Sequence, residues 1–321
     1  MTTSASRHLV DQQLAPILDL FPTSQLSMET LPASRARAIP FPVDPDSVGR
    51  VTMTRRTIPG PADAPDVDVI VYRPAEAAGA LPCIFHVHGG GYVGGAAGEM
   101  EFLHRPLARD LGCMIISVEY RLAPETRFPG AIEDSYAALA WVNANAGDLG
   151  VDLGRMGVMG ESAGGGLAAA LALLVRDRGE YAFAFQHLIY PMIDDRTCTV
   201  AEPHPYTGEF IWTPHNNHFG WSCLLGVEPG SDGVSPYAAA ARAEDLAGLP
   251  PTFISTGALD LFLEEDMEYA RRLTRAGVPV EFHIYPGGFH AFDMMPGVAV
   301  SAQARNDSLA ALKRALFPPA G

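Results

Sequence analysis

The chain alternates between short runs of β-forming apolar residues and longer segments whose apolar positions follow helical spacing. The short runs predict strands at 50–58, 67–74, 82–88, 113–120, 155–160, 185–190, 252–256 and 280–286. Helical spacing predicts helices at 8–20, 130–146, 163–176 and 264–276. Runs such as PCIFHVH and CMIISVEY are apolar almost throughout, which is typical of strands buried on both faces. This alternation predicts an α/β fold with a mostly parallel sheet wrapped by helices.

Two stretches interrupt the alternation. Residues 31–47 contain four prolines and several polar residues, and they predict a loop or linker. Residues 191–236 hold two of the three tryptophans and several prolines, and an insertion of this length favours a lid or binding element. We therefore expect a catalytic domain over 48–321 and a discontinuous cap formed by residues 1–47 and 191–236.

Composition and charge exclude several kinds of partner. The 321 residues are 48% hydrophobic, enough for a large core, and the net charge of −15 argues against nucleic-acid or anionic-membrane binding. The longest apolar run, LAAALALLV, is far shorter than the ~20 residues of a membrane-spanning helix. The N-terminus lacks the pattern of a secretory signal, and the four cysteines form no C-x-x-C pair. We expect reduced thiols and a cytoplasmic protein without membrane insertion.

The stretch GVMGESAGGG, residues 157–166, is the strongest single motif. It places Ser162 between a predicted strand and a predicted helix, with Gly160 and Gly164 on either side. G-x-S-x-G at such a turn is the nucleophile turn of the α/β-hydrolases, where a sharp bend exposes the serine. The alternative is a glycine-rich helix start that only packs closely on a sheet. The setting favours the nucleophile.

A serine nucleophile needs a base, and the base needs an orienting carboxylate. In this class of enzyme the order along the chain is serine, acid, histidine. Asp260 follows the predicted strand 252–256, and His290 follows the strand 280–286. Both therefore lie beyond the carboxyl ends of strands, where open parallel sheets gather their active sites. Glu264 is the rival acid, although its place in a first helical turn also suits an acidic residue.

The other histidines have simpler interpretations. His283 alternates within a strand and is expected to be structural. His204, His215 and His218 fall in the insertion; the last two have metal-ligand spacing, but no third ligand is placed beside them. We expect solvated lid residues there, and neither a metal nor an organic cofactor.

A second glycine cluster, HVHGGGYVGG at 86–95, follows the strand 82–88. Glycines let backbone N–H groups approach a developing oxyanion closely. A phosphate-binding loop is the alternative, but neither of the usual phosphate-loop patterns is present. Because Ser162 supplies chemistry that requires an oxyanion hole, we interpret the cluster in that way.

With these motifs in place, the sequence resembles the hormone-sensitive-lipase-like family of α/β-hydrolases. The resemblance spans roughly residues 65–295 and rests on HVHGGGYVGG, SVEYRLAPETRFPGAIED, VMGESAGGGLAA and YPGGFHAF. It implies an eight-stranded, mostly parallel sheet flanked by helices, with a helical cap. The chain departs from the family at Glu161, where Asp or Thr is usual, and at Leu261, where Pro is common.

The resemblance also implies roles for individual residues. Ser162 would be the nucleophile, His290 the base and Asp260 the orienting acid. The remaining implied residues form the oxyanion hole through backbone N–H groups (Gly90, Gly91 and Ala163) or shape its loop (His88 and Gly89). Family members often pair through the edge of the sheet, which implies a possible homodimer through VEFHIYP at 280–286.

The function expected from these features is hydrolysis of short- to medium-chain apolar carboxylic esters through an acyl-enzyme. The cap aromatics, which could bind substrate or form the cap's own small core, are Tyr206, Phe210, Trp212, Phe219 and Trp221. An amidase, lactonase or acyltransferase could use the same triad, and a non-catalytic binding protein could use the same scaffold. A triacylglycerol lipase is less favoured because no strongly amphipathic lid helix is evident.

Overall fold

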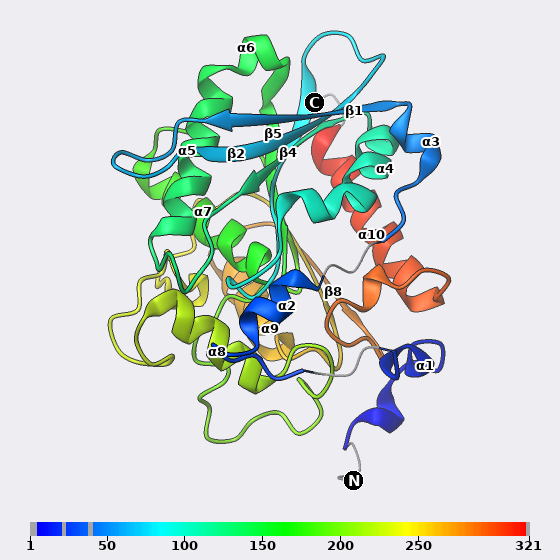
Figure 1. Ribbon diagram of the computed structural model, residues 1–321, viewed down its shortest axis with the longest axis vertical. Coiled ribbons are helices and arrows are strands. Elements are labelled where there is room, and N and C mark those ends of the chain that lie inside the picture. Colours follow the sequence, from blue (N-terminus) through cyan, green and yellow to red (C-terminus); the bar gives the residue numbers. More distant parts are fainter. Residues whose placement is uncertain (1–4, 21–23, 38–40, 319–321) are drawn as a thin grey trace.

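The computed structural model describes residues 5–20, 24–37 and 41–318. The described chain forms one eight-stranded sheet in the order β1-β2-β4-β3-β5-β6-β7-β8 (Figure 1). Strand β2 is antiparallel to both of its neighbours, and β4, β3 and β5 to β8 run parallel. The predicted α/β fold with an eight-stranded, mostly parallel sheet is confirmed.

Each strand lies where its apolar run predicted it, within a few residues. The bounds are β1 Val51–Ile58, β2 Val67–Pro74, β3 Leu81–Val87, β4 Met114–Glu119, β5 Val151–Glu161, β6 Gln186–Ile189, β7 Thr252–Gly257 and β8 Val280–Tyr285. The largest difference is β5, which begins four residues earlier than predicted because Val151 pairs with Leu81 ahead of a bulge.

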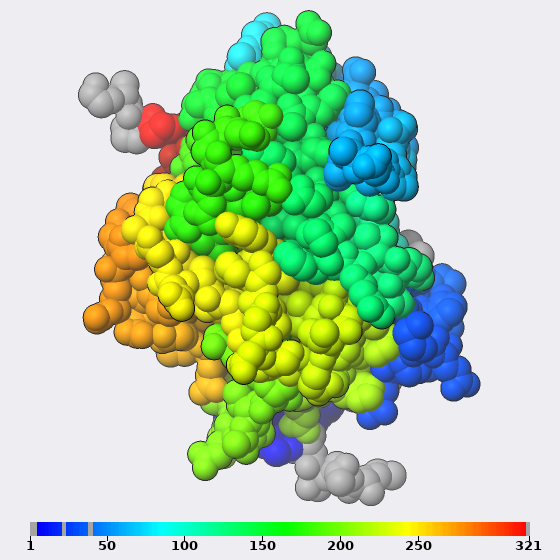
Figure 2. All heavy atoms as spheres, turned by 90° about the vertical axis from the view of Figure 1, so that its left-hand side faces the viewer, coloured from blue at the N-terminus to red at the C-terminus, as the bar shows by residue number. Residues whose placement is uncertain are grey.

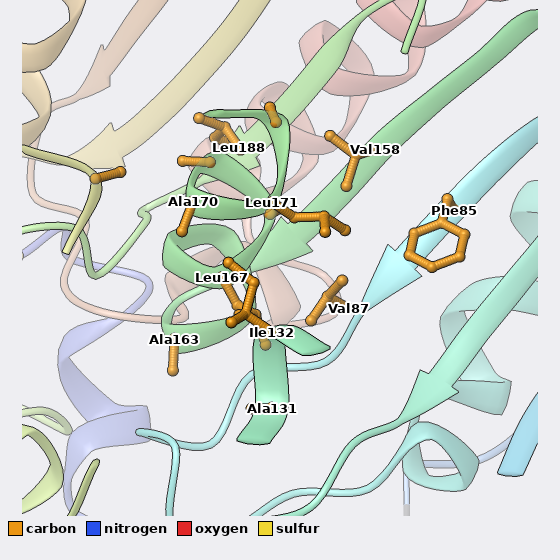
Figure 3. Close-up of a cluster of buried hydrophobic side chains, with 14 of the residues drawn as sticks. Phe85, Val87, Ala131, Ile132, Val158, Ala163, Leu167, Ala170, Leu171 and Leu188 are labelled. Carbon is orange, nitrogen blue, oxygen red and sulfur yellow. The ribbon is translucent and has the colours of Figure 1, made fainter. Parts of the chain in front are cut away.

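Helices cover both faces of the sheet. One face carries α5 (Gly130–Ala144), α7 (Ala163–Arg178) and α9 (Leu263–Arg275), and the other carries α4 (Glu101–Leu111) and α10 (Ala299–Leu316). Alternate side chains of the central strands enter the two cores: Phe85 packs towards α7, whereas its neighbour Ile84 packs towards α4 and α10. Figure 3 shows the first core, with Leu167 and Leu171 of α7 against the strands. A sheet covered on both faces explains the nearly continuous apolar runs.

The sequence pattern did not predict helices α4 and α10. On α4, the buried residues include His104 and Arg105 as well as Ala108 and Leu111. Polar residues on the inner side interrupt the apolar stripe by which a helix is recognised in a sequence.

The predicted helix over 8–20 is wrong in extent. The chain there forms a 3-10 turn at Arg7–Leu9 and the short helix α1 at Ala15–Leu18. Val10 is extended at the end of the first turn, and Asp11 donates its backbone N–H to the carbonyl of Gly287. The apolar spacing instead reflects packing of Val10, Leu14 and Leu18 against the cluster around residues 285–298.

The interpretation of 31–47 as a loop is also wrong in part. It contains the short helices α2 (Leu31–Ala36) and α3 (Pro45–Val48), each with a proline in its first turn, where the missing N–H has no helical partner to lose. Residues 38–40 of this stretch lie outside the described residues.

The insertion at 191–236 folds around one helix, α8 (Pro214–Leu225), and lies against the N-terminal segment. Leu26 donates its backbone N–H to Oδ1 of Asn216 at 2.8 Å, and Asn216 donates from Nδ2 to the carbonyl of Ser24 at 2.9 Å. Figure 2 shows the blue N-terminal segment beside the yellow-green insertion. Two segments about 190 residues apart in sequence therefore meet on one side of the molecule.

The last strand, β8, forms one edge of the sheet and leaves Ile284 41% exposed. Pairing of two copies through this edge stays a prediction, to be tested by the molar mass in solution. Across the described residues, we find no helix with the length and apolar character required to span a membrane.

Candidate active site

The strand-to-helix turn after β5 holds Ser162 in a backbone conformation that is unusual for a residue with a side chain. Its φ is +56° and its ψ is −124°, and α7 begins at the next residue. A Cβ on Gly160 would lie 2.2 Å from the carbonyl oxygen of Gly164, and one on Gly164 would lie 2.2 Å from that of Val87. The two glycines are thus required by close approach of the backbone, which is the physical reason for the G-x-S-x-G pattern.

Three side chains from three separate loops meet at this turn. Nε2 of His290 lies 2.9 Å from Oγ of Ser162, and Nδ1 of His290 lies 2.9 Å from Oδ2 of Asp260. Because the carboxylate of Asp260 accepts this hydrogen bond, Nδ1 is the protonated, donating nitrogen of His290, which leaves Nε2 to accept a hydrogen bond from the hydroxyl of Ser162. Their exposed fractions are 8% for Ser162, 6% for His290 and 0% for Asp260. The structure brings the predicted serine, histidine and aspartate together.

The loop after β3 lies beside the serine. No hydrogen bond within the described part of the chain uses the backbone N–H of Gly90 or Gly91. Ala163 is the first residue of α7, so its N–H is one of the helix's unpaired donors. Among the described residues, the backbone N–H groups of these three predicted oxyanion donors thus have no acceptor.

His88 and Gly89 lie at the start of this loop and are held by hydrogen bonds and ring stacking. Burial lowers the pKa of His88 to about 4, so its imidazole is neutral near pH 7. Nδ1 of His88 donates to the carbonyl of Gly89 at 2.8 Å, and its ring stacks on Tyr120 at 4.2 Å between centroids. The hydroxyl of Tyr120 donates to the carbonyl of His88 at 2.8 Å. These contacts fix the start of the glycine loop.

A cavity of about 300 Å³ opens onto the serine. Besides the predicted residues, it is lined by Ala96, Glu99, Met100, Glu161, Tyr190, Trp212, Ala291 and Met294. The sequence analysis missed Tyr190 as a site residue. Its position just beyond β6, at the same end of the sheet as the other site loops, was the available signal. The ring of Tyr190 lies 4.8 Å from that of His290.

The aromatic residues of the insertion divide between the cavity and the core. Trp212 lines the cavity, and a Cβ on Gly91 would lie 2.2 Å from its ring. Trp221 is buried against Tyr92, and Phe210 is buried in the cluster with Phe289. Phe219 is partly buried against the main core, and Tyr206 is 43% exposed. Among the described residues that line this cavity, Trp212 is the one that comes from these five aromatics.

The remaining candidates from the sequence lie elsewhere. Glu264 is exposed and lines a different pocket, so Asp260, not Glu264, contacts His290. Nε2 of His215 bonds the carbonyl of Leu26, and Nε2 of His218 lies 2.7 Å from Glu228. Nδ1 of His204 accepts from the backbone of Tyr206. Nε2 of His283 lies 2.9 Å from Glu281.

Asp293, three residues after His290 in the chain, should make stability depend on pH. It accepts a hydrogen bond from the hydroxyl of Tyr190 at 2.8 Å, and desolvation raises its pKa to about 6. An unfolded aspartate titrates near ~3.9, so the folded protein binds this proton more tightly. The stabilising contribution is complete below about pH 4 and is lost as the pH rises through about 6.

We therefore expect Asp293→Asn to flatten the fall in unfolding free energy between about pH 4 and pH 7. At pH 8 the variant should be more stable than wild type by about 1–2 kcal/mol, a figure reduced for partial solvent access. Urea unfolding across this pH range measures the effect. Asp307→Asn is the matched control, because it removes another carboxylate that accepts from a tyrosine, Tyr285. Equal slopes for wild type and Asp293→Asn would contradict the prediction.

Comparison with known proteins identifies the family of this chain. The family model described as the alpha/beta hydrolase fold matches residues 84–294. Carboxylesterase NlhH of Mycobacterium tuberculosis is 33% identical over 98% of both chains, and esterase LipI of the same organism is 32% identical over 97% of both. The solved structure of a bacterial heroin esterase is 37% identical, covers 97% of this chain and 99% of its own, and superposes with a TM-score of 0.87.

The chain belongs to the α/β-hydrolase family, within the hormone-sensitive-lipase-like group that its motifs resemble. It is an enzyme of the carboxylic ester hydrolase class.

Proposed function

We propose that this enzyme is a serine carboxylesterase that hydrolyses short- to medium-chain apolar esters through an acyl-enzyme. The observation that supports this most strongly is the run of two 2.9 Å contacts from Ser162 through His290 to Asp260. A serine becomes an effective nucleophile when a positioned base accepts its proton, and the base is best oriented by a buried carboxylate.

In this mechanism Oγ of Ser162 attacks the ester carbonyl carbon while its proton passes to Nε2 of His290. The carbonyl oxygen becomes an oxyanion, stabilised by the backbone N–H groups of Gly90, Gly91 and Ala163. The C–O bond to the alcohol then breaks, and His290 returns the proton to the departing oxygen. Water then attacks the acyl carbon and gives a proton to His290. The bond between that carbon and Oγ of Ser162 breaks, His290 returns the proton to Oγ, and the acid is released.

The division into a catalytic domain over 48–321 and a cap from 1–47 and 191–236 is part of the proposal. It is supported by the contacts of Ser24 and Leu26 with Asn216 and by the position of Trp212 against the glycine loop. A cap made of these two segments would contribute Trp212 to the wall of the substrate cavity. A cytoplasmic location stays a prediction from the sequence.

The cavity predicts the range of acyl chains. A volume of about 300 Å³, at the small end for ligand pockets, leaves room for a short chain beside the ester group. A methylene that fits changes transition-state binding by about 1–3 kcal/mol, and one that finds no room gains none of it. We expect kcat/KM for p-nitrophenyl esters to peak at acyl chains of about two to six carbons and to fall at least ~10-fold for chains of about twelve.

The same series tests the proposed function against its rivals. Trp212→Ala, which enlarges the cavity, should move the optimum to longer chains while short esters are still cleaved. The esterase proposal would be wrong if wild type cleaved p-nitroanilides or lactones but no p-nitrophenyl ester. The enzyme would then be an amidase or a lactonase. An optimum at the longest chains would contradict the size limit alone.

A further inference from the structure

Glu161, the residue before the nucleophile, makes a buried contact that the catalytic steps above do not use. Its two carboxylate oxygens lie 3.2 and 2.9 Å from Nε2 of His86. Nδ1 of His86 lies 2.9 Å from Oγ of Ser117. All three side chains are buried, with exposed fractions of 4% for Glu161 and 0% for His86 and Ser117.

These residues join three neighbouring strands at the catalytic end of the sheet. Glu161 is the last residue of β5, His86 lies on β3 and Ser117 lies on β4. The strands β5 and β3 are parallel neighbours, with Val87 opposite Gly160. Beyond this point β5 leads directly to Ser162, and β3 leads to the glycine loop that begins at His88. The contact therefore links the two segments that carry the nucleophile and the oxyanion donors.

The backbones of these two segments also touch. A Cβ on Gly89 would lie 2.8 Å from the carbonyl oxygen of Glu161, so the loop rests on the residue before the nucleophile. The ring of His86 also packs against the ring of His104, with 4.2 Å between their centroids. His86 is thus enclosed between Glu161 and His104, and an aspartate at position 161 would have a side chain one methylene shorter with which to reach it.

We propose that Glu161 and His86 are a positioning pair, which holds the nucleophile turn and the oxyanion loop at the separation that catalysis requires. The inference rests on the proposed function. Loss of either partner leaves the other buried without its hydrogen bond, which favours local rearrangement. A shift of about 1 Å between reacting groups can cost ~100-fold in rate. We therefore expect loss of the pair to lower kcat.

The experiment is a set of variants at the pair, assayed with p-nitrophenyl acetate. Glu161→Ala and His86→Ala should each lower kcat by about 10- to 100-fold with KM within about twofold. The double variant should be no worse than either single variant, because the two residues act as one unit. Glu161→Gln keeps an acceptor at the same reach and should recover most of the loss, whereas Glu161→Asp keeps the charge but is too short and should recover less.

His187→Ala is the matched control. His187 is also buried on a neighbouring strand, β6, and bonds a serine, Ser308, at 2.8 Å, but it lies outside the catalytic cavity. It should lose stability while keeping kcat. The inference is overturned if Glu161→Ala keeps kcat within about twofold, if His187→Ala loses as much, or if the single losses multiply in the double variant.

Two variants keep the test informative if the alanine proteins do not fold. If Glu161→Asp has the kcat of wild type while Glu161→Gln loses activity, the charge of the side chain matters and its length does not. The positioning role would then be wrong. These outcomes differ from failure of the proposed function, in which wild type and Ser162→Ala would hydrolyse the ester equally.

Discussion

Replacing Ser162 with alanine is expected to lower kcat for p-nitrophenyl ester hydrolysis by about a millionfold. The hydroxyl is the group that lies 2.9 Å from Nε2 of His290, and no other hydroxyl within the described residues bonds that atom. Without it no acyl-enzyme forms. The cavity and oxyanion donors would remain and supply only the residual catalysis that such sites give to a bound substrate and water.

The measurement is initial rate with wild type and variant purified in the same way. Ser135→Ala is a suitable control, because Ser135 is also buried and its hydroxyl donates to the carbonyl of Ala131 within α5, away from the cavity at Ser162. It should keep full activity. A Ser162→Ala protein that is folded, by circular dichroism, and still turns over the ester would show that another residue is the nucleophile.

Replacing Asp260 with asparagine is expected to lower kcat by about 10⁴-fold. Asp260 accepts from Nδ1 of His290 at 2.9 Å and also accepts from the backbone N–H of Phe262 at 3.1 Å. The backbone donor holds the amide oxygen of asparagine at that side, which turns the amide N–H towards His290. The imidazole must then accept at Nδ1 and carry its proton on Nε2, so it can no longer take the proton of Ser162.

The matched control is Glu264→Gln, which removes the rival acid considered from the sequence. Glu264 is exposed and lines a separate pocket, so kcat should stay within about twofold of wild type. The reverse pattern, with activity lost in Glu264→Gln and kept in Asp260→Asn, would show that Glu264, and not Asp260, is the acid.

The sequence alone predicted the fold and the principal catalytic candidates, because each rests on local patterns. Buried parallel strands appear as continuous apolar runs, and the strand bounds therefore agree within a few residues for most of the sheet. The nucleophile turn is equally local, since Gly160 and Gly164 are imposed by backbone contacts close to Ser162. Asp260 and His290 could be chosen because the ends of parallel strands converge on one edge.

Local pattern was a poorer guide in the N-terminal segment. The apolar spacing of 8–20 suggested one helix, but the residues pack as separate turns against the loop around Phe289. Here the tertiary contacts, and not an intrinsic helical tendency, decide which residues are buried.

What only the tertiary structure decided is which distant residues meet. The contact of Leu26 with Asn216, the approach of Trp212 to Gly91 and the pairing of Glu161 with His86 each join segments far apart in the chain. Such contacts depend on how segments distant in sequence pack together, which no local periodicity encodes. By itself the sequence predicted the class of enzyme and its candidate catalytic groups; the packed structure determined the shape of the cavity and which side chains lie around Ser162, because that depends on how distant segments pack.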